Sequence, residues 1–423
     1  MDEILFLSHR IPYPPNKGDK LRSFNLLKQL SPDYRVHVGA FIDDEDDWRH
    51  ADAVRAMAGG ECHFARLTPR HAKLRSLPAL LGGAPLSLPY YRDAGLRQWV
   101  DRLLAERPVR RAIIFSGAMA QYLDGPGYNH LRRIVDFVDV DSDKWRQYAA
   151  TRPWPLSWVY RREARTLLRY ERRVAAAVDA SVFVSTGEAE FFRRLAPEAA
   201  ARVWGIHNGV DTVYFDPARD YPVPYTPGEK AVVFTGALDY WANVDAVTWF
   251  AREIFPAVRR REPAARFYIV GARPGAAVRQ LAQLPGVTVT GAVHDIRPYL
   301  AHARMAVAPL RIARGVQNKV LEAMAMAMPV VVTPQALDGI ECEAGKEVVL
   351  AENAGDFAEQ VCDLLFSDAP NLAAAARRRV VSDYSWEGNL RQFRDFLEGE
   401  PLPGTIGNRH AVEAMMSADP GTK

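Results

Sequence analysis

The chain has 423 residues, of which 48% are hydrophobic and 25% charged, and its formal net charge is +3. This composition excludes a disordered chain, and the length predicts two domains. No run approaches the roughly 18 apolar residues of a membrane span. The start, MDEILFLSHR, lacks a signal-peptide pattern, and three cysteines without ligand spacing (Cys62, Cys342, Cys362) fit reduced thiols, so we expect a cytoplasmic protein.

Short apolar runs alternate with helical segments in the first half of the chain. Each run ends in small or polar residues, as buried parallel strands do. Helices are expected at 21–30 and 160–177. The expected strands are 4–8, 36–42, 112–116, 133–138 and 180–185.

The loop after the first strand has the features of an anion site. Three prolines stiffen it, and Gly18 permits a close backbone approach just before a helix. Lys17, Lys20 and Arg22 add positive charge. A rigid loop with solvated lysines is the alternative interpretation.

Residues 66–111 hold 10 basic and 3 acidic residues. Within them, RHAKLRSLPALL (70–81) combines cations with leucines, which suits an anionic membrane surface. A solvated face packed on its own domain fits the pattern equally well. Nucleic acid is not an expected partner, because no recognised nucleic-acid motif is present.

An acidic cluster, DFVDVDSDKW, follows the run at 133–138 and contains two overlapping D-x-D patterns. Closely spaced carboxylates of this kind can hold Mg²⁺ or Mn²⁺, but the motif is short and common. We favour Asp139, Asp141 and Ser142 as contacts for hydroxyl groups of a ligand. A solvated acidic loop remains open for any single Asp.

The second half repeats the alternation after a segment rich in Pro and Gly at 206–229. A helix fits 245–260, and alternation of this kind implies parallel sheets with right-handed crossovers. A last helix at 386–400 carries Trp386, Leu390, Phe393 and Leu397 on one face, and 401–423 is expected to be a flexible tail. The expected strands are 231–236, 265–271, 287–291, 305–310 and 329–333.

The most informative stretch is 305–333, MAVAPLRIARGVQNKVLEAMAMAMPVVVT. A strand, a polar loop with Gly315 and a helix follow one another. Lys319 and Glu322 lie three apart near the helix start, so one face presents both. A helix N-terminus with a lysine seats a phosphate, and a carboxylate accepts from a diol such as ribose. The pattern therefore predicts a nucleotide site.

This stretch resembles the nucleotide-sugar loop of the retaining GT-B glycosyltransferases of family 4. In that family two Glu residues stand eight positions apart, and the second is followed by Ala and later by Gly-x-Pro-Val-Val. Here Glu322-Ala323 and Pro329-Val330-Val331 match, whereas Arg314 replaces the first Glu and Ala327 the glycine. The second Glu usually holds the ribose, and the first usually faces the transferred sugar.

The whole chain resembles a narrower group, the sugar transferases encoded with PEP-CTERM/exosortase systems and exopolysaccharide clusters. The matching segments are Pro12-Tyr13-Pro14-Pro15, DVDSDKW (139–145), Asn208-Gly209-Val210-Asp211, FTGALDYWANVDA (234–246) and GVQNKVLEAMA (315–325). The resemblance implies two Rossmann-like α/β domains facing across a cleft. Their expected bounds are 1–205 for the acceptor domain, 206–229 for the linker and 230–385 for the nucleotide-sugar domain, with the last helix crossing back.

The implied reaction moves a sugar from a nucleotide-diphospho-sugar to a lipid-linked or polysaccharide acceptor, with retention, at the inner face of the membrane. No cofactor or metal is expected. The implied catalytic residues are Lys319, Glu322 and Arg314. The implied donor-binding residues are Gly18, Gly236, Asn243, Arg273, His294, Asp295, Gly315, Val316, Gln317 and Asn318. The implied acceptor or sugar contacts are Lys17, Lys20, Arg22, Asp139, Asp141 and Ser142.

Two alternatives stay open within the same fold. One is a nucleotide-sugar 2-epimerase, although the acid and base that elimination and re-addition need do not stand out in the sequence. The other is a non-catalytic relative that binds nucleotide-sugar or glycan, which Arg314 keeps open. A dehydrogenase is not expected, because Gly271-Ala272-Arg273-Pro274-Gly275 is not a dinucleotide fingerprint.

Overall fold

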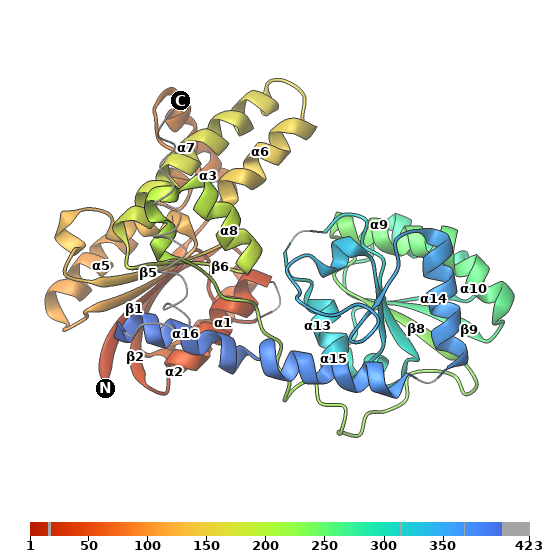
Figure 1. Cartoon of the computed structure of the whole chain (residues 1–423). Helices are drawn as coiled ribbons and strands as arrows, with labels where there is room; N and C mark the ends of the chain where they lie inside the picture. Colours follow the sequence, from red (N-terminus) through yellow and green to blue (C-terminus); the bar gives the residue numbers. More distant parts are fainter. Residues whose placement is uncertain (16–17, 314, 368, 400–423) are drawn as a thin grey trace, which may run out of the picture. The chain divides into compact units, whose positions relative to one another are not determined.

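The computed structural model describes residues 1–15, 18–313, 315–367 and 369–399. The chain forms two compact units. Unit 1 comprises Met1–Ile206 and the chain from Leu390 onward, and unit 2 comprises His207–Asn389. Figure 1 shows that each unit is a parallel sheet with helices on its faces. The expected α/β class, with two Rossmann-like domains, is confirmed.

Unit 1 is built on a seven-stranded sheet of order β3-β2-β1-β4-β5-β6-β7, in which neighbouring strands are parallel. Chain order reverses between β1 and β4, so the loops after these strands diverge there and leave room for a ligand. The strands are β1 (Asp2–Ser8), β2 (Tyr34–Ile42), β3 (Gly59–Arg66), β4 (Arg111–Phe115), β5 (Arg132–Val138), β6 (Ala180–Phe183) and β7 (Val203–Gly205).

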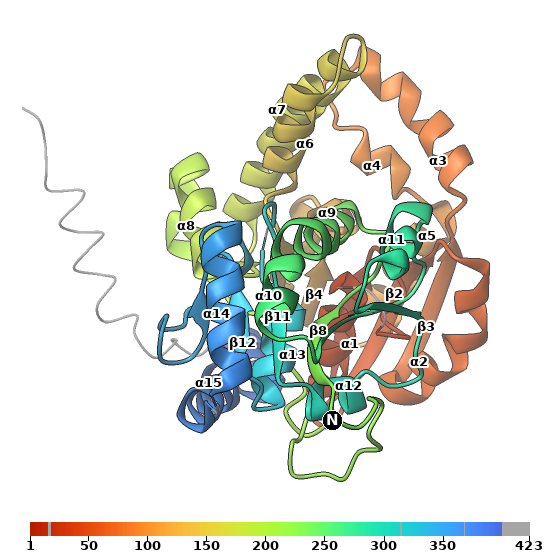
Figure 2. The same ribbon diagram turned by 90° about the vertical axis from the view of Figure 1, so that its right-hand side faces the viewer.

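The helices of unit 1 cover both faces of this sheet, and α6 and α7 run side by side as a helical pair at one end of the unit (Figure 2). The helices are α1 (Gly18–Leu30), η1 (Glu45–His50), α2 (Ala51–Ala58), α3 (Pro69–Ser76), η2 (Leu77–Leu81), α4 (Ser87–Tyr90), α5 (Ala94–Glu106), η3 (Gly117–Leu123), η4 (Pro126–Tyr128), α6 (Asp141–Thr151), α7 (Leu156–Ala177), α8 (Thr186–Leu195) and η5 (Pro197–Arg202).

Unit 2 is built on a six-stranded parallel sheet of order β10-β9-β8-β11-β12-β13. Its strands are short and almost wholly apolar, because helices cover both faces. Chain order reverses between β8 and β11. The strands are β8 (Lys230–Thr235), β9 (Ala265–Val270), β10 (Val287–Gly291), β11 (Met305–Ala308), β12 (Val330–Val332) and β13 (Val349–Leu350).

One helical stretch of unit 2 is continuous but irregular: α9 runs through a π-helical turn, η6, into α10. The expected helix at 245–260 lies within it. The helices are α9 (Trp241–Trp249), η6 (Phe250–Ile254), α10 (Phe255–Arg261), α11 (Ala276–Gln280), η7 (Leu281–Gln283), α12 (Arg297–His302), α13 (Asn318–Ala325), η8 (Pro334–Leu337), α14 (Ala354–Phe366) and α15 (Pro370–Asp383).

The last helix, α16 (Trp386–Glu398), begins in unit 2 and continues as part of unit 1. The apolar face expected from the sequence is buried, and Phe393 is 0% exposed. Arg111 Nε donates to the Leu397 carbonyl at 3.0 Å, and the Phe396 ring lies 5.6 Å from that of Trp204. The C-terminal helix is therefore a layer of unit 1.

The segment that the sequence analysis treats as a linker packs on unit 2 from residue 207 onward. Phe215 and Tyr225 are buried in its core. The Tyr225 hydroxyl donates to the Tyr299 carbonyl at 2.5 Å. Residues 207–229 therefore lie within unit 2. No helix in the described part of the chain has the length and apolar character that a bilayer span requires.

Candidate functional site

The loops after β8 and β11 meet at the switch point of the unit 2 sheet. The first loop starts at Gly236, whose φ is +156°. The backbone there passes so close to Gly271 that a Cβ at 271 would lie 1.8 Å from the Gly236 carbonyl oxygen. Only glycine at 271 allows this approach. The carboxyl ends of β8 and β9 thus lie close together beside the start of α13.

Lys319 connects the two loops. Its Nζ donates to Asn243 Oδ1 at 2.8 Å, and Asn243 Nδ2 donates to the Ala237 carbonyl at 2.8 Å. A Cβ at Gly236 would lie 2.9 Å from Asn243 Nδ2 and 3.3 Å from Lys319 Cε. The structure therefore brings together three of the predicted donor-site residues: Gly236, Asn243 and Lys319.

Burial shifts the proton equilibria of Lys319 and Glu322 towards neutral pH. Burial lowers the pKa of Lys319 to about 8, and the nearby Glu322 carboxylate opposes this only in part. Burial likewise raises the pKa of Glu322 to about 7 against the effect of Lys319. Both groups are half-buried on the same helix face. Each would regain its charge if a ligand supplied an anion to the lysine or hydroxyl donors to the carboxylate.

The loop before α13 supplies the helix start. Gly315 has a φ of +68°, and its N–H donates to Asp338 Oδ2 at 3.2 Å. Gln317 is the N-cap residue, and its side chain donates to the Gly315 carbonyl. Asn318 Oδ1 is buried and accepts no hydrogen bond within the described residues. Val316 packs against the core of unit 2. Arg314 lies outside the described residues.

The other predicted donor contacts already have partners. Arg273 pairs with Asp239, with Nε and Oδ2 2.6 Å apart. Asp295 accepts from the backbone N–H of Arg297 at 2.9 Å and from its guanidinium, so its carboxylate caps α12. His294 is exposed in the same turn. The Asp295 carboxylate is thus bonded within its own turn, and His294 is the more exposed residue of this pair.

In unit 1, the expected surface cations Lys20 and Arg22 are buried. Lys20 Nζ pairs with Asp47 at 2.5 Å, and Arg22 Nε pairs with Asp136 at 2.7 Å. The two basic side chains are 1% and 0% exposed. They fasten α1 to its own domain, and their predicted contact with an acceptor stays a prediction. Lys17 lies outside the described residues.

Gly18 begins α1, and a Cβ there would meet nothing within 4 Å.

The residues of the acidic cluster at 136–145 differ in exposure. Asp143 is buried and accepts from Arg146 at 2.6 Å, whereas the Asp141 side chain is 43% exposed. The backbone N–H of buried Ser142 donates to Glu171 at 3.2 Å, and Asp139 follows the end of β5. Among the described residues, no three His, Cys, Asp or Glu side chains are grouped so that they could hold a metal ion.

A polar cluster at the carboxyl ends of β1 and β2 escaped the sequence analysis. His9 Nε2 lies 3.2 Å from Asp19 Oδ2, and the ring stacks on Phe115 at 5.9 Å. Arg10 bonds both Asp43 and Asp19. His9 Nδ1 is buried and has no hydrogen-bond partner within the described residues. In the sequence, this cluster was indicated by the pair His9-Arg10 directly after the first strand.

Burial disfavours the Asp19 carboxylate, but the hydrogen bond from His9 and the charges of His9 and Arg10 outweigh it. The pKa of Asp19 is therefore held well below its ordinary value. Asp19 stays an acceptor that orients the His9 ring, which makes an edge contact with the Tyr91 ring, the centroids lying 5.8 Å apart. This cluster can hydrogen-bond a hydroxyl group of a ligand.

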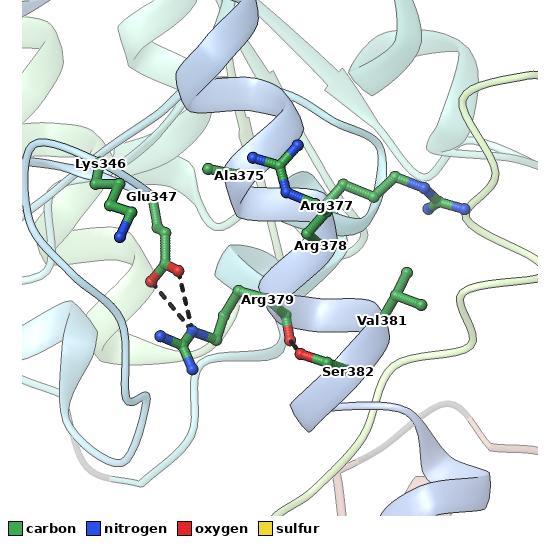
Figure 3. A pocket seen from close by; sticks show the side chains of 8 residues that line it. All are labelled: Lys346, Glu347, Ala375, Arg377, Arg378, Arg379, Val381 and Ser382. Carbon is green, nitrogen blue, oxygen red and sulfur yellow. Dashed lines mark hydrogen bonds and ion pairs between the residues drawn. The ribbon is translucent and has the colours of Figure 1, made fainter.

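A separate concavity of unit 2, about 660 Å³ in volume, lies between α15 and the loop before β13 (Figure 3). Two of the arginines that line it, Arg377 and Arg379, are bonded to groups within unit 2. Arg379 Nε donates to both oxygens of Glu347 at 3.1 and 3.2 Å, and Arg377 donates to the Phe215 carbonyl at 2.8 Å. None of the predicted site residues lines it.

Comparisons with solved structures agree with this architecture. Sucrose-phosphate synthase from Thermosynechococcus elongatus matches with a TM-score of 0.66 at 17% identity, covering 94% of this chain and 99% of that one. HepE from Anabaena, in complex with UDP, matches with a TM-score of 0.64 at 14% identity, covering 94% and 100%. WaaG, a glycosyltransferase involved in lipopolysaccharide biosynthesis, matches with a TM-score of 0.62 at 14% identity, covering 94% and 100%. At these identities the likeness shows the fold alone.

Residues 229–367 match the family model described as Glycosyl transferases group 1. The matched segment contains the β8 loop, the β11 loop and α13, which are the elements that gather Gly236, Asn243 and Lys319. No curated protein matches the chain. Unit 2 therefore contains a segment similar to the group 1 glycosyl transferases, and the two-domain fold is of the GT-B type. The narrower resemblance to exosortase-associated transferases, and retention, stay predictions.

Proposed function

We propose that the protein transfers a sugar from a nucleoside-diphosphate sugar to a lipid-linked or polysaccharide acceptor in exopolysaccharide biosynthesis, with retention at the anomeric carbon. The observation that carries the proposal is the placement of Lys319 and Glu322 on one face at the start of α13, with Asn243 fixing the lysine at 2.8 Å. A phosphate-binding helix start beside a carboxylate matches a nucleoside diphosphate, which has an anionic diphosphate next to the hydroxyl groups of a ribose. The UDP and UDP-glucose complexes of HepE support the same class of donor.

In this proposal the ribose and the diphosphate of the donor both have partners on unit 2. Glu322 accepts hydrogen bonds from the ribose hydroxyls. Lys319 and the backbone N–H groups at the start of α13 hold the diphosphate. Negative charge grows on the diphosphate as the sugar departs, so donors already fixed around it stabilise the transition state without rearranging. The departing phosphate also serves as the base for the acceptor hydroxyl, and no protein nucleophile is required.

The acceptor hydroxyl is assigned to unit 1. The His9 ring, oriented by Asp19, offers Nδ1 as a hydrogen-bond partner, and the half-exposed Asp141 is a second candidate contact. We propose these two groups as acceptor contacts in place of Lys20 and Arg22, which form buried ion pairs within unit 1. We also propose that the acceptor lies at the inner surface of the membrane.

Binding and product analysis test the proposal together. Calorimetry with UDP, GDP and ADP and their sugars should find one nucleoside diphosphate that binds clearly more tightly than the others. The matching labelled donor should then lose its sugar, by transfer or slow hydrolysis, with the anomeric configuration retained. An epimerised sugar, or binding without any turnover in the presence of extracts containing acceptors, would contradict the proposed reaction.

We also infer that turnover needs no divalent metal, because Lys319 and the α13 start supply the positive charge that the diphosphate needs. Activity should survive EDTA and change little when Mg²⁺ or Mn²⁺ is added. Activity that is abolished by EDTA and restored by either ion would make Asp139 and Asp141 metal ligands and overturn this inference.

A further inference from the structure

Unit 1 exposes a set of large apolar side chains at one end. Seven of the sixteen exposed large apolar side chains in the described part of the chain lie on two segments, the α6–α7 hairpin and the α3–η2 segment. Trp154 is 79% and Leu81 96% exposed. The seven are Leu74, Leu77, Leu81, Tyr148, Trp154, Leu156 and Trp158. Single exposed apolar residues need no explanation, but a cluster marks an interaction surface.

The two segments form one surface because they are joined by buried polar side chains of α7. The Arg162 guanidinium donates to the carbonyls of Ala79, Gly82 and Ala84, which end η2 and continue past it. Glu163 accepts from the N–H of Leu86 at 2.6 Å. These bonds hold η2 against the first turns of α7, and Figure 2 shows the α6–α7 pair and α3 converging at this end.

The hairpin is held in shape by aromatic rings other than the exposed tryptophans. The Trp145 ring lies 5.2 Å from that of Tyr160 and 5.9 Å from that of Tyr148. The Trp145–Tyr160 contact is part of the packing of α6 against α7. Trp154 and Trp158 take no part in these ring contacts, and both are exposed.

The surroundings of this apolar tip are basic. Residues 144–162 contain five Lys or Arg and no Asp or Glu, and residues 69–84 contain three and none. Lys73, Arg70 and Arg152 are exposed. Arg75 is anchored to the carbonyls of Pro89 and Tyr90 but keeps its charge at the same surface. Tryptophan and leucine flanked by cations match the interface of an anionic bilayer, where rings sit at headgroup level and cations face lipid phosphates.

We propose that the α6–α7 tip and η2 form a docking surface for an anionic lipid bilayer, with Trp154, Trp158 and Leu81 entering the interface. A nucleic acid would not need the leucines, and a protein partner would not need the exposed cations Arg70, Lys73 and Arg152 around them. The proposal stands on this surface and is independent of the transfer reaction. It also assigns the insertion element to the α6–α7 hairpin, whereas the sequence pattern had pointed only to 70–81.

Sedimentation of the full-length protein with vesicles tests the surface. Vesicles of phosphatidylcholine with phosphatidylglycerol should bind the protein at low salt, and vesicles of phosphatidylcholine alone should bind it clearly less. The triple variant Trp154→Ser/Trp158→Ser/Leu81→Ser should lose binding to the anionic vesicles at every salt concentration. The matched control Phe366→Ser, which changes a 58% exposed ring on unit 2, should bind like the wild type.

The cationic rim has its own variant, Arg70→Gln/Lys73→Gln/Arg152→Gln. Because a basic residue near an anionic surface contributes about 1 kcal/mol, or about fivefold in affinity, the three changes should weaken binding on the order of a hundredfold and flatten its salt dependence. Nucleotide affinity should be unchanged in all variants, which separates this surface from the donor site. Wild-type binding by the tip variant, equal binding to both lipids, or a tip-dependent dimer without lipid binding would overturn the proposal.

Discussion

At the scale of single residues, the proposed donor site depends on two charged side chains of α13, Lys319 and Glu322, whose charged forms are disfavoured by burial. Lys319 and Glu322 are near each other, yet burial shifts the pKa of both towards neutral pH, to about 8 and about 7. A site that is already neutralised would show no such shifts. Such shifts are frequent at functional sites, and in the proposed function a bound donor completes the hydrogen bonds and charges of the pair.

Replacement of either residue should separate binding from turnover. Glu322→Ala removes hydrogen bonds to a charged acceptor, so we expect donor affinity to fall about 10- to 100-fold with the fold intact. Lys319→Ala should lower turnover more than affinity, because the diphosphate gains charge in the transition state. Calorimetry and steady-state kinetics measure both. Glu359→Ala, an exposed carboxylate on α14, is the control and should change neither. Wild-type values for the two site variants would remove their assigned roles.

The pKa shifts also predict a change of sign in proton exchange on donor binding. Near pH 8, Lys319 is about half deprotonated, and a bound diphosphate favours the ammonium form, so binding takes up protons. Near pH 7, Glu322 is about half protonated, and ribose hydroxyls favour the carboxylate, so binding releases protons. Calorimetry in buffers of different ionisation enthalpy should show release at pH 7 and below, and uptake above pH 8.

Two variants assign this proton exchange to its groups. Lys319→Met should abolish the uptake above pH 8, and Glu322→Gln should abolish the release near pH 7. Because the two groups are coupled, each variant should also move the remaining transition. Identical proton numbers in the wild type and both variants would show that other groups titrate on binding.

At the scale of elements, α1 is fastened to the sheet of unit 1 by buried ion pairs. Arg22 Nε bonds Asp136 of β5 at 2.7 Å and Arg22 Nη1 bonds the Ile206 carbonyl at 2.9 Å. Burial raises the pKa of Asp136, and the charge of Arg22 counteracts it. A buried pair of this kind contributes little net stability, but loss of one partner leaves an uncompensated charge.

Arg22→Met should therefore destabilise unit 1 by about 3–5 kcal/mol at pH 7. The pKa of the stranded Asp136 would rise further above its ordinary value, so the loss should grow as pH rises through that value and shrink in acid. Urea unfolding at pH 7 and in mild acid measures it. The double variant Arg22→Met/Asp136→Leu should recover most of the loss, and Arg55→Met, from an exposed pair with Asp52, should cost less than about 1 kcal/mol. Equal costs for the two single variants would contradict the role given to this pair.

The same helix shows what could and could not be predicted from the sequence. The central strands and α1 itself were predictable, because buried parallel strands are continuous apolar runs. Which face of α1 its cations occupy was not, since the partners of Lys20 and Arg22 stand 27 and 114 residues away in the chain. The edge strand β3 was missed because its residues are mostly half-buried, and two-residue β13 is too short to carry a pattern.

The same reasoning applies to the sites. The α13 seat was predictable, because its loop, lysine and glutamate are consecutive in the sequence. The His9–Asp19 pair was not, because its meaning depends on Asp43 of a different loop and on the ring of Phe115 from another strand. Local motifs were therefore enough to predict the arrangement of Lys319 and Glu322, whereas the polar cluster of unit 1 became visible only in the fold.

At the scale of the whole molecule, each unit has its own core, and the chain passes from unit 1 to unit 2 and back. The return is made by α16, whose apolar face is buried as part of unit 1. Unit 1 is consequently incomplete until the end of the chain has been made, whereas unit 2 is continuous in sequence. Contacts of such long sequence separation are costly to form in folding, because they close a long loop.

Phe393→Ala tests this division of stability. Phe393 is 0% exposed on α16, and removal of a buried phenyl ring costs about 3–5 kcal/mol. Scanning calorimetry should show the transition of unit 1 moving to lower temperature while that of unit 2 stays in place. A nucleoside diphosphate that binds unit 2 should raise only the latter transition, which identifies it. Val381→Ala, at a side chain of α15 that is 45% exposed, should move neither by more than a degree or two. A shift of the unit 2 transition by Phe393→Ala would show that α16 stabilises both units, because its first turn, from Trp386 to Asn389, belongs to unit 2.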